Sequence, residues 1–259
     1  MADYIEMEVK QGVAIITLKR AEKRNALNGF MVHELRQAFK QACSDATVAV
    51  VMLKGDGEHF CAGGDIQWMH EMSQRSTEDN YEDALQLAEL MYEIYNCRKP
   101  TIALAHGKTM GGGLGLLAAC DMVYAAEDAS FCFAEVKVGI TPSTISPYVV
   151  AAIGERYTKY YFLTGDSFDV KQAQQIGLVH AIMPNANLVE NSLKLAVLMQ
   201  QNSLQAMMAA KELVREVAAE PINISTRSMT AMHLAKLRKT ADAQEGLQAF
   251  IEKRKPRWK

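Results

Sequence analysis

The sequence contains few cysteines and no cysteine motif. The five cysteines form no CxxC pair and their odd number argues against a disulfide framework, so we expect free thiols in a reducing compartment: Cys43, Cys61, Cys97, Cys120 and Cys132. No apolar stretch approaches the roughly 20 residues that span a bilayer. The first residues, Met1–Glu6, do not resemble a signal or transit peptide. We therefore expect a soluble cytoplasmic protein with no membrane association.

Strong charge and ligand motifs are also absent. The formal net charge of −2 gives no electrostatic basis for binding nucleic acid over the whole molecule. The six histidines have no metal-ligand spacing, so we expect no metal site. Gly107-Lys108-Thr109 resembles the end of a P-loop, but that loop needs a glycine where this chain has Ile102. The sequence also lacks a GxGxxG spacing and a Gly-x-Ser-x-Gly element, which argues against a nucleotide-dependent enzyme and a serine hydrolase.

Apolar periodicity predicts alternating strands and helices along most of the chain. We expect strands over 5–9, 13–18, 49–53, 102–105, 122–126 and 178–183, and helices over 29–43, 77–97 and 114–119. This alternation favours an α/β fold with partly parallel strands. Helical periodicity dominates from Leu188, so we expect a core over residues 1–195 and a helical C-terminal region over residues 196–259.

Two glycine-bearing segments, Phe60–Asp65 and Gly111–Gly115, each follow a strand-like run and lead into a helix-like run. Such a turn leaves backbone N–H groups unpaired at a helix start, beside a backbone with no side chains to block approach. Two such groups aimed at one point would hold a developing oxyanion, where losing one donor typically raises the barrier by about 3–4 kcal/mol. With Glu135 nearby for proton transfer, the pattern predicts an enzyme that makes an enolate. Taken singly, the glycines also fit close helix packing and Glu135 a solvated strand edge.

Short segments that recur in a fixed order identify a resemblance over nearly the whole chain. They are Leu18-Lys19-Arg20, Asn25-Ala26-Leu27, Phe60–Ile66, Lys99–Ala103, Gly111-Gly112-Gly113, Ala119-Cys120-Asp121, Phe131–Gly139, Ala173–Val179 and Glu245–Lys255. In this order they resemble the crotonase, or enoyl-CoA hydratase/isomerase, superfamily. The resemblance implies a crotonase spiral of β-β-α repeats and an assembly into homotrimers or hexamers. It also implies an acyl-CoA thioester substrate, with coenzyme A as part of the substrate and no other cofactor.

Matched position by position, the resemblance implies an oxyanion hole made by the N–H groups of Gly64 and Gly112, with Glu135 as a catalytic glutamate. It implies contacts with the CoA arm at Lys23, Ala26 and Leu27. It implies contacts with the adenine around Ala62, Asp65 and Ile66. It also implies that Phe250 and Lys253 contact CoA from a C-terminal helix, often that of a neighbouring subunit.

The chain departs from the family pattern at Gly115, where the family's other catalytic glutamate should stand, three residues after Gly112. Glycine cannot transfer a proton, and three mechanisms stay open. Glu135 alone hydrates a 2-enoyl-CoA, or it moves a proton between carbons and isomerises a 3-enoyl-CoA to the 2-enoyl form. In the third, a substrate group or another side chain supplies the second function, with Ser143, Thr144 and Glu71 as candidates.

A second resemblance bears on the choice between these reactions. Residues 140–147, ITPSTISP, together with Ile153–Arg156 and Tyr160–Thr164, resemble the bacterial methylglutaconyl-CoA hydratase branch of leucine degradation. This implies a branched substrate with its own distal carboxylate, and we favour hydratase over isomerase on that resemblance. The alternative from another class is an inactive CoA-thioester-binding or RNA-associated protein, in view of Gly115 and the basic end at residues 253–259.

Overall fold

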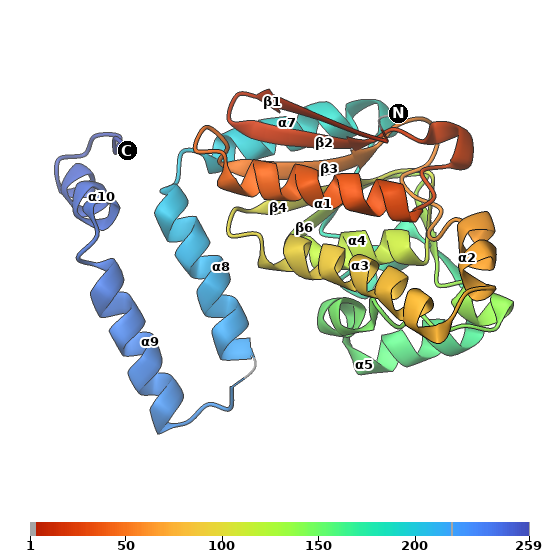
Figure 1. The fold of residues 1–259 in the computed structure, drawn as a ribbon. Coiled ribbons are helices and arrows are strands. Elements are labelled where there is room, and N and C mark those ends of the chain that lie inside the picture. The colour runs from red at the N-terminus through yellow and green to blue at the C-terminus, as the bar shows by residue number, and fades with distance from the viewer. Residues whose placement is uncertain (1–3, 219, 259) are drawn as a thin grey trace.

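A six-stranded sheet lies at the centre of the protein, in a computed structural model that describes residues 4–218 and 220–258 (Figure 1). The strand order is β1-β2-β3-β4-β6-β9. β1 pairs with β2 in an antiparallel hairpin, and every other neighbouring pair in this sheet is parallel. The strands are β1 (Ile5–Lys10), β2 (Val13–Leu18), β3 (Val50–Gly55), β4 (Thr101–Ala105), β6 (Met122–Ala126) and β9 (Ala181–Met183). The predicted α/β class, the hairpin and the parallel strands are confirmed.

Helices cover both faces of this sheet, because its inner strands are apolar on both sides. All six residues of β2 are buried, and successive side chains point to opposite faces. Ala14 and Ile16 join a core cluster with α1 (Gly29–Ser44), α3 (Thr77–Asn96) and α4 (Gly112–Ala119). Val13 and Ile15 join a second cluster with α7 (Leu188–Met199), on the opposite face (Figure 1). The sheet is thereby held between two apolar layers.

A second, smaller sheet has three short strands in the order β5-β7-β8. They are β5 (Lys108–Met110), β7 (Ser130–Cys132) and β8 (Ser167–Asp169). Three residues are too few for apolar alternation to be visible in a sequence, which is why no strand was expected there. The other elements of the core are α2 (Ile66–Ser73), α5 (Ser146–Thr164), α6 (Val170–Gln175) and the 3-10 turns η1 (Ala21–Lys23), η2 (Glu135–Val138) and η3 (Asn185–Asn187).

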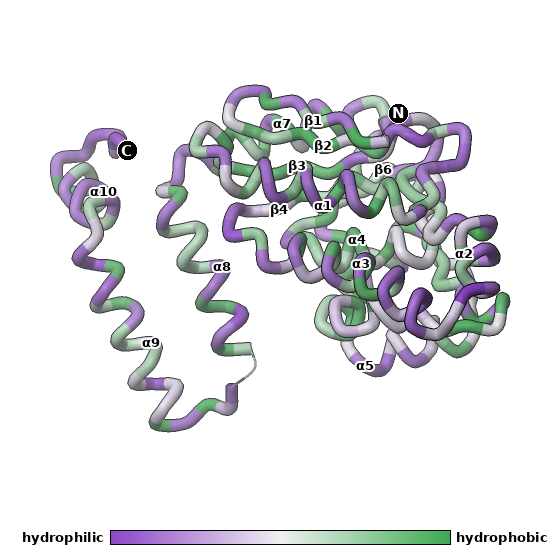
Figure 2. The backbone as a smooth tube through the Cα atoms, viewed as in Figure 1, coloured by the Kyte–Doolittle hydropathy of each residue, from purple (hydrophilic) through white to green (hydrophobic). Residues whose placement is uncertain are grey.

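Three helices follow the core: α8 (Leu204–Ala218), α9 (Ile224–Leu237) and α10 (Ala241–Ile251). Figure 1 shows α9 and α10 standing away from the sheet, with α8 between them and the core. Figure 2 shows apolar and polar residues mixed along all three helices. The expected boundary between residues 195 and 196 falls inside α7, which packs on the sheet through Leu188, Ser192 and Ala196. None of the described helices is both long and apolar enough to cross a bilayer.

The expectation that all five thiols are free is wrong for one pair. Cys43, in the last turn of α1, and Cys97, directly after α3, form a disulfide with their Cα atoms 6.1 Å apart. The cysteines are 54 residues apart, and only the packing of α1 against α3 brings them together. The other three thiols are free and buried: Cys61, Cys120 and Cys132. The cysteines therefore give weaker support for a reducing compartment than five free thiols would.

Candidate active site

The two glycine-bearing segments lie side by side, as the chemistry expected of them requires. Cys61 forms a parallel bridge with Thr109, and the Met110 amide donates to the Cys61 carbonyl at 2.9 Å. The Gly111 amide donates to the Cys132 carbonyl at 3.0 Å, so the second segment also continues the small sheet. The small sheet, which was not expected from the sequence, thus fixes the two segments against each other.

Two of the glycines are needed because backbone atoms approach them closely. Gly63 has φ +87°, and a Cβ there would lie 2.8 Å from the Met110 carbonyl oxygen. A Cβ on Gly113 would lie 2.7 Å from the Cys61 carbonyl oxygen. Any side chain at either position would separate the two segments.

The amides of Gly64 and Gly112 are close together and have no partner. Gly112 is the first residue of α4, where helix geometry leaves an N–H group unpaired. Neither amide donates to any atom of the described part of the chain. A Cβ on Gly112 would lie 4.0 Å from the Gly64 nitrogen, and one on the neighbouring Gly63 would lie 3.4 Å from the Gly112 nitrogen. This pair of free donors can bind one oxyanion.

Glu135 lies against the same turn. It is the first residue of η2, and its Oε1 would lie 2.7 Å from a Cβ on Gly111. Its Oε2 is buried and accepts no hydrogen bond from the described residues. Burial of the carboxyl raises its pKa. A carboxyl with a raised pKa and a free oxygen beside two free amides is suited to accept and return a proton.

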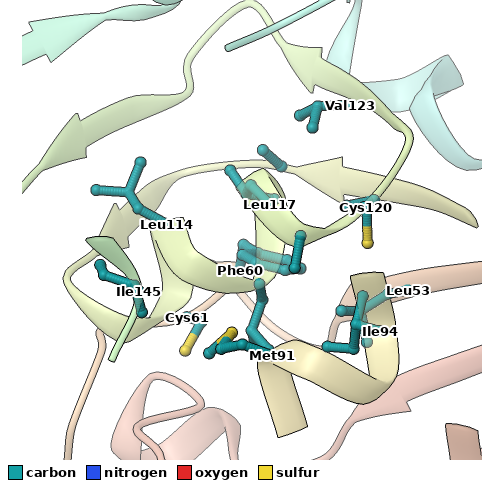
Figure 3. Packing of buried hydrophobic residues seen from close by; sticks show 14 of the residues in the cluster. Leu53, Phe60, Cys61, Met91, Ile94, Leu114, Leu117, Cys120, Val123 and Ile145 are labelled. Atoms are coloured by element: carbon teal, nitrogen blue, oxygen red, sulfur yellow. The ribbon is translucent and has the colours of Figure 1, made fainter. Parts of the chain in front are cut away.

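The position expected for a second carboxylate is filled by apolar atoms. Gly115 is one helical turn beyond Gly111, whose carbonyl accepts from the Gly115 amide at 3.3 Å. A Cβ on Gly115 would lie 2.8 Å from Ile145 Cβ and 3.2 Å from Met91 Cε. Figure 3 shows Ile145 and Met91 in this cluster beside α4. The missing glutamate therefore leaves no space, because Ile145 occupies it.

None of the three candidates for a second functional group is paired with Glu135 in the described part of the chain. Ser143 is exposed and its hydroxyl bonds with Thr141. Glu71 is exposed on α2, where its Oε1 accepts from Gln67 at 3.3 Å. Thr144 is half-buried. None of the three hydrogen-bonds Glu135 within residues 4–218 and 220–258.

Sequence reasoning missed a buried asparagine that holds the first glycine segment in place. Asn25 is fully buried with φ +55°, in the left-handed region that asparagine tolerates better than most residues. Its side-chain amide donates to the carbonyls of Asp56, His59 and Phe60 at 2.9–3.1 Å. Its own carbonyl accepts from the Cys61 thiol at 3.1 Å. An asparagine in a short polar turn was the only sequence signal for this role.

Arg20 and Asp65 join the same scaffold. The Arg20 guanidinium donates to Asp65 at 2.6 Å and to the Ala26 carbonyl at 2.9 Å. The other Asp65 oxygen caps α2 by accepting from the Gln67 amide at 2.9 Å. Burial opposes ionisation of Asp65, but Arg20 and the helix amides outweigh it and lower the pKa of the carboxyl. Asp65 was expected near the adenine; in the structure it links the segment that carries Gly64 to Arg20 and to α2.

The residues expected to contact CoA near the glycines do lie around them. The Leu27 amide donates to the Gly63 carbonyl at 2.7 Å, and the Ala62 amide donates to the Arg24 carbonyl at 2.9 Å. Ala26 and Leu27 are buried, whereas Lys23 and Ile66 are exposed. These residues form a rim with an exposed cation and an exposed apolar side chain next to the free amides.

Phe250 and Lys253 lie far from this rim in the same chain. Phe250, on α10, is 84% exposed, and Lys253 follows the end of that helix. Figure 1 places α10 and α2 at opposite ends of the molecule. Contacts of these two residues with the site would therefore have to come from another copy of the chain.

The described residues contain no cluster of three or more histidine, cysteine, aspartate or glutamate side chains arranged to hold a metal ion. A cavity of about 670 Å³ lies away from the free amides, between the core and α8. Its polar side chains are already paired: Lys211 donates to Asp121 at 2.6 Å, and Arg215 donates to the Tyr95 carbonyl at 3.2 Å. In the described part of the chain, the amides of Gly64 and Gly112 and the Oε2 of Glu135, which lie close together, are without partners.

Comparisons with known proteins find similar sequences and structures. A family model described as enoyl-CoA hydratase/isomerase matches residues 8–259. The chain is 32% identical to the 2,3-dehydroadipyl-CoA hydratase of Escherichia coli, over 96% of each chain. It is also 32% identical to a mitochondrial enoyl-CoA hydratase of Pongo abelii, over 95% of this chain and 83% of that one. The crystal structure of an enoyl-CoA hydratase from Shewanella pealeana matches with a TM-score of 0.95 and 36% identity, covering 99% of this chain and 96% of that chain.

Proposed function

Because the chain belongs to the enoyl-CoA hydratase/isomerase family, we propose that it adds water to a short or branched 2-enoyl-CoA, with Glu135 as its acid and base. The observation that carries this proposal is the pair of free amides, Gly64 and Gly112, beside the half-buried Glu135, whose Oε2 is buried and has no partner among the described residues. The thioester carbonyl accepts hydrogen bonds from both amides. These bonds strengthen as charge develops on the oxygen, which lowers the barrier to the enolate.

Glu135 performs both proton transfers in this mechanism. Its carboxylate takes a proton from water while the oxygen of that water bonds to the β-carbon. The electron pair of the double bond moves onto the thioester as an enolate held by Gly64 and Gly112. The protonated Glu135 then returns the proton to the α-carbon, which gives a 3-hydroxyacyl-CoA and restores the carboxylate. A carboxyl with its pKa raised by burial is better matched to this double role than a solvated one.

The relatives and the sequence resemblance support one substrate class. One relative is named for 2,3-dehydroadipyl-CoA, an enoyl-CoA that carries a distal carboxylate. The resemblance to methylglutaconyl-CoA hydratases points to a substrate with the same feature. A distal carboxylate on the substrate would add a second carboxylate beside Glu135. We therefore place 3-methylglutaconyl-CoA, the substrate of the hydratase branch of leucine degradation, first among the substrates to test.

One observation favours isomerisation of a 3-enoyl-CoA as the second candidate. Ile145 and Met91 close the space beside Gly115, so no second carboxylate helps to hold a water molecule. Moving one proton from Cα to Cγ needs only Glu135 and the two amides. An inactive CoA-thioester-binding protein is the third candidate, because Gly115 departs from the family pattern.

Product analysis in oxygen-18 water separates these candidates. Purified protein is assayed with crotonyl-CoA, 3-methylglutaconyl-CoA and a 3-enoyl-CoA. We expect labelled 3-hydroxyacyl-CoA from a 2-enoyl substrate, and a loss of about 10²–10⁴-fold in turnover for Glu135→Gln. Glu155→Gln, which changes an exposed glutamate on α5, is the matched control and keeps full turnover.

The other outcomes each exclude a candidate. Double-bond migration without oxygen label supports the isomerase, and the hydratase proposal then fails. No turnover on any enoyl-CoA, with CoA thioesters still bound, supports the inactive binder. If Glu135→Gln retains wild-type turnover, another group carries the proton.

The assembly proposed with this function is a homotrimer or a hexamer of two trimers. It is supported by the apolar side chains that α9 and α10 leave exposed, including Ile224, Met232 and Phe250. It would also bring Phe250 and Lys253 of one copy to the CoA of another. We propose coenzyme A as part of the substrate and no further cofactor, no nucleic-acid or membrane partner, and a cytoplasmic location.

A further inference from the structure

Ile145 fills the space beside Gly115, one helical turn from the free amide of Gly112, and from this position we infer that it determines which acyl groups the protein accepts. This inference rests on the proposed function, because it concerns the acyl chain of the enoyl-CoA. It adds a specificity-determining residue that takes no part in proton transfer. The direction in which the acyl chain must run decides which side chains it meets.

The thioester oxygen and the α-carbon are fixed by two sets of groups. The oxygen lies at the amides of Gly64 and Gly112, and the α-carbon lies within reach of Glu135, whose Oε1 packs against Gly111. The β-carbon and the remaining acyl chain must continue past Glu135. The wall at this point is the first turn of α4, where Gly115 shares a face with Gly111 and Gly112.

Ile145 stands on that wall. A helical side chain tilts toward the N-terminus of its helix, so a substituent at Gly115 would point back toward the turn that carries Gly111 and Gly112. The atoms nearest to it would be those of Ile145, followed by Met91 Cε at 3.2 Å. Figure 3 shows both side chains in the apolar cluster. The Ile145 side chain therefore fills the space beside Gly115, in the first turns of α4. In the proposed complex it would face the β-carbon and the acyl carbons beyond it.

The surroundings of Ile145 make it a fixed barrier. It is 1% exposed and Met91 is fully buried, so no open channel passes them. Ile145 precedes the first residue of α5, and Pro147 follows at the start of that helix, which fixes the backbone at this point. The chain between Glu135 and Ile145 is short, and the Ile140 amide donates to the Glu135 carbonyl at 3.2 Å. The catalytic carboxyl and the barrier are thus held by one connected segment.

Gly115 and Ile145 form a coupled pair in this arrangement. Because Gly115 has no side chain, Ile145 can fill the space beside it. A substitution at either position therefore changes the space available to the other residue. A larger residue at 115 would push Ile145 toward the substrate, and a smaller residue at 145 would open the acyl end. The structure assigns the depth of the acyl site to this pair.

The test compares 2-enoyl-CoAs with four-, six- and eight-carbon acyl chains. For Ile145→Ala, we expect the ratio of kcat/KM for the eight-carbon over the four-carbon substrate to rise at least about tenfold over wild type. Ile145→Val, which folds with less disturbance, shifts the ratio in the same direction by less. Gly115→Ala lowers the ratio, and the double variant Gly115→Ala/Ile145→Ala restores it.

Ile153→Ala is the matched control. Ile153 is a buried isoleucine of α5 in the same apolar cluster as Ile145, but the atoms nearest to a Cβ on Gly115 belong to Ile145 and Met91, not to Ile153. We expect this variant to lower the melting temperature and to leave the chain-length ratio at the wild-type value. A loosened core alone would shift the ratio in both alanine variants, and that result would overturn the inference.

The inference also fails if wild type hydrates the four-carbon substrate while Ile145→Ala and Ile145→Val keep the wild-type ratio. Such a result leaves the proposed function intact, because hydration itself is observed. If wild type turns over neither these three substrates nor 3-methylglutaconyl-CoA, the proposed function fails instead, and the inference falls with it. The two failures are therefore separate observations.

Discussion

The core and the C-terminal helices differ in where their apolar side chains lie. In the core every residue of β2 is buried, and six residues of α4 are buried. Among the described residues, α8 and α9 have no buried side chain, and α10 has only Ala249. Phe250 of α10 is instead 84% exposed. The core thus buries its apolar side chains within one chain, whereas the C-terminal helices leave several of theirs exposed.

This difference shows which parts of the protein can be understood from a single chain. The core buries its own apolar surface and holds both free amides and Glu135 in fixed positions. The C-terminal helices leave apolar surface for another molecule to cover, which is unusual for a folded monomer when the residues are many and close together. Catalysis should therefore respond to changes in the core, and assembly should respond to changes in the C-terminal helices.

Of the changes to the backbone of the core, removing one amide should have the largest effect. Gly112→Pro deletes the N–H group at the first position of α4, where proline is tolerated in a helix. We expect kcat to fall by about 10²–10³-fold, because the oxyanion loses one of its two donors. Steady-state kinetics on the best enoyl-CoA, with CoA affinity measured by calorimetry, checks the result.

Gly112→Ala is the matched control for that experiment, since alanine keeps the N–H group. Its methyl group would lie 3.3 Å from Leu27 Cδ1, the end of a side chain that can move. Most of the activity should remain. Equal losses in the alanine and proline variants would mean that the space around Gly112, rather than its N–H group, supports turnover.

Neutralising Glu135 should make the core more stable even as turnover is lost. Burial raises the pKa of this carboxyl, so the folded state holds its proton to a higher pH than the unfolded chain, whose value is near 4.5. The contribution of this proton to stability is complete below that unfolded value and is lost as pH rises through the folded pKa. At pH 8 we expect Glu135→Gln to unfold with a free energy about 1 kcal/mol higher than wild type.

Denaturant unfolding at pH 4 and pH 8 provides the measurement, with an expected gain only at pH 8. Glu93→Gln is the contrasting variant, because Glu93 also has a buried oxygen without a partner but its Oε1 accepts from Arg36 at 2.7 Å. That substitution should lower stability, since it leaves Arg36 with a weaker partner. A gain in both variants would indicate that charge in general, and not the site of Glu135, is unfavourable.

The sequence predicted the parts of the core that depend on local pattern. β2 and β6 lie where the apolar runs indicated, and the glycine segments meet as two turns with free amides. It could not predict β5, because three residues show no period, or the Cys43–Cys97 pair, because only helix packing joins those two positions.

Ile145 was missed for a related reason. The sequence marks Gly115 as the place of an absent glutamate, and absence suggests an open space. Only coordinates show that a side chain from the start of α5 fills it. When a side chain that is distant in the sequence fills the space beside a glycine, neither the apolar periodicity nor a motif of one sequence reveals it.

The smallest effect on the core should come from the C-terminal helices. Phe250→Ser replaces an 84% exposed side chain, and exposed substitutions usually change the free energy of unfolding by less than about 0.5 kcal/mol. Its effect on association should be larger, because burying a phenylalanine against a partner contributes about 1.5–3 kcal/mol. Sedimentation equilibrium should show subunits dissociating at a higher protein concentration than in wild type. Val9→Ser, at an exposed position of β1, is the control and should leave the assembly unchanged. If Phe250→Ser instead lowers the unfolding free energy of the dissociated chain by more than about 1 kcal/mol, the C-terminal helices are part of the folding unit of the core, and the contrast between the two regions does not hold.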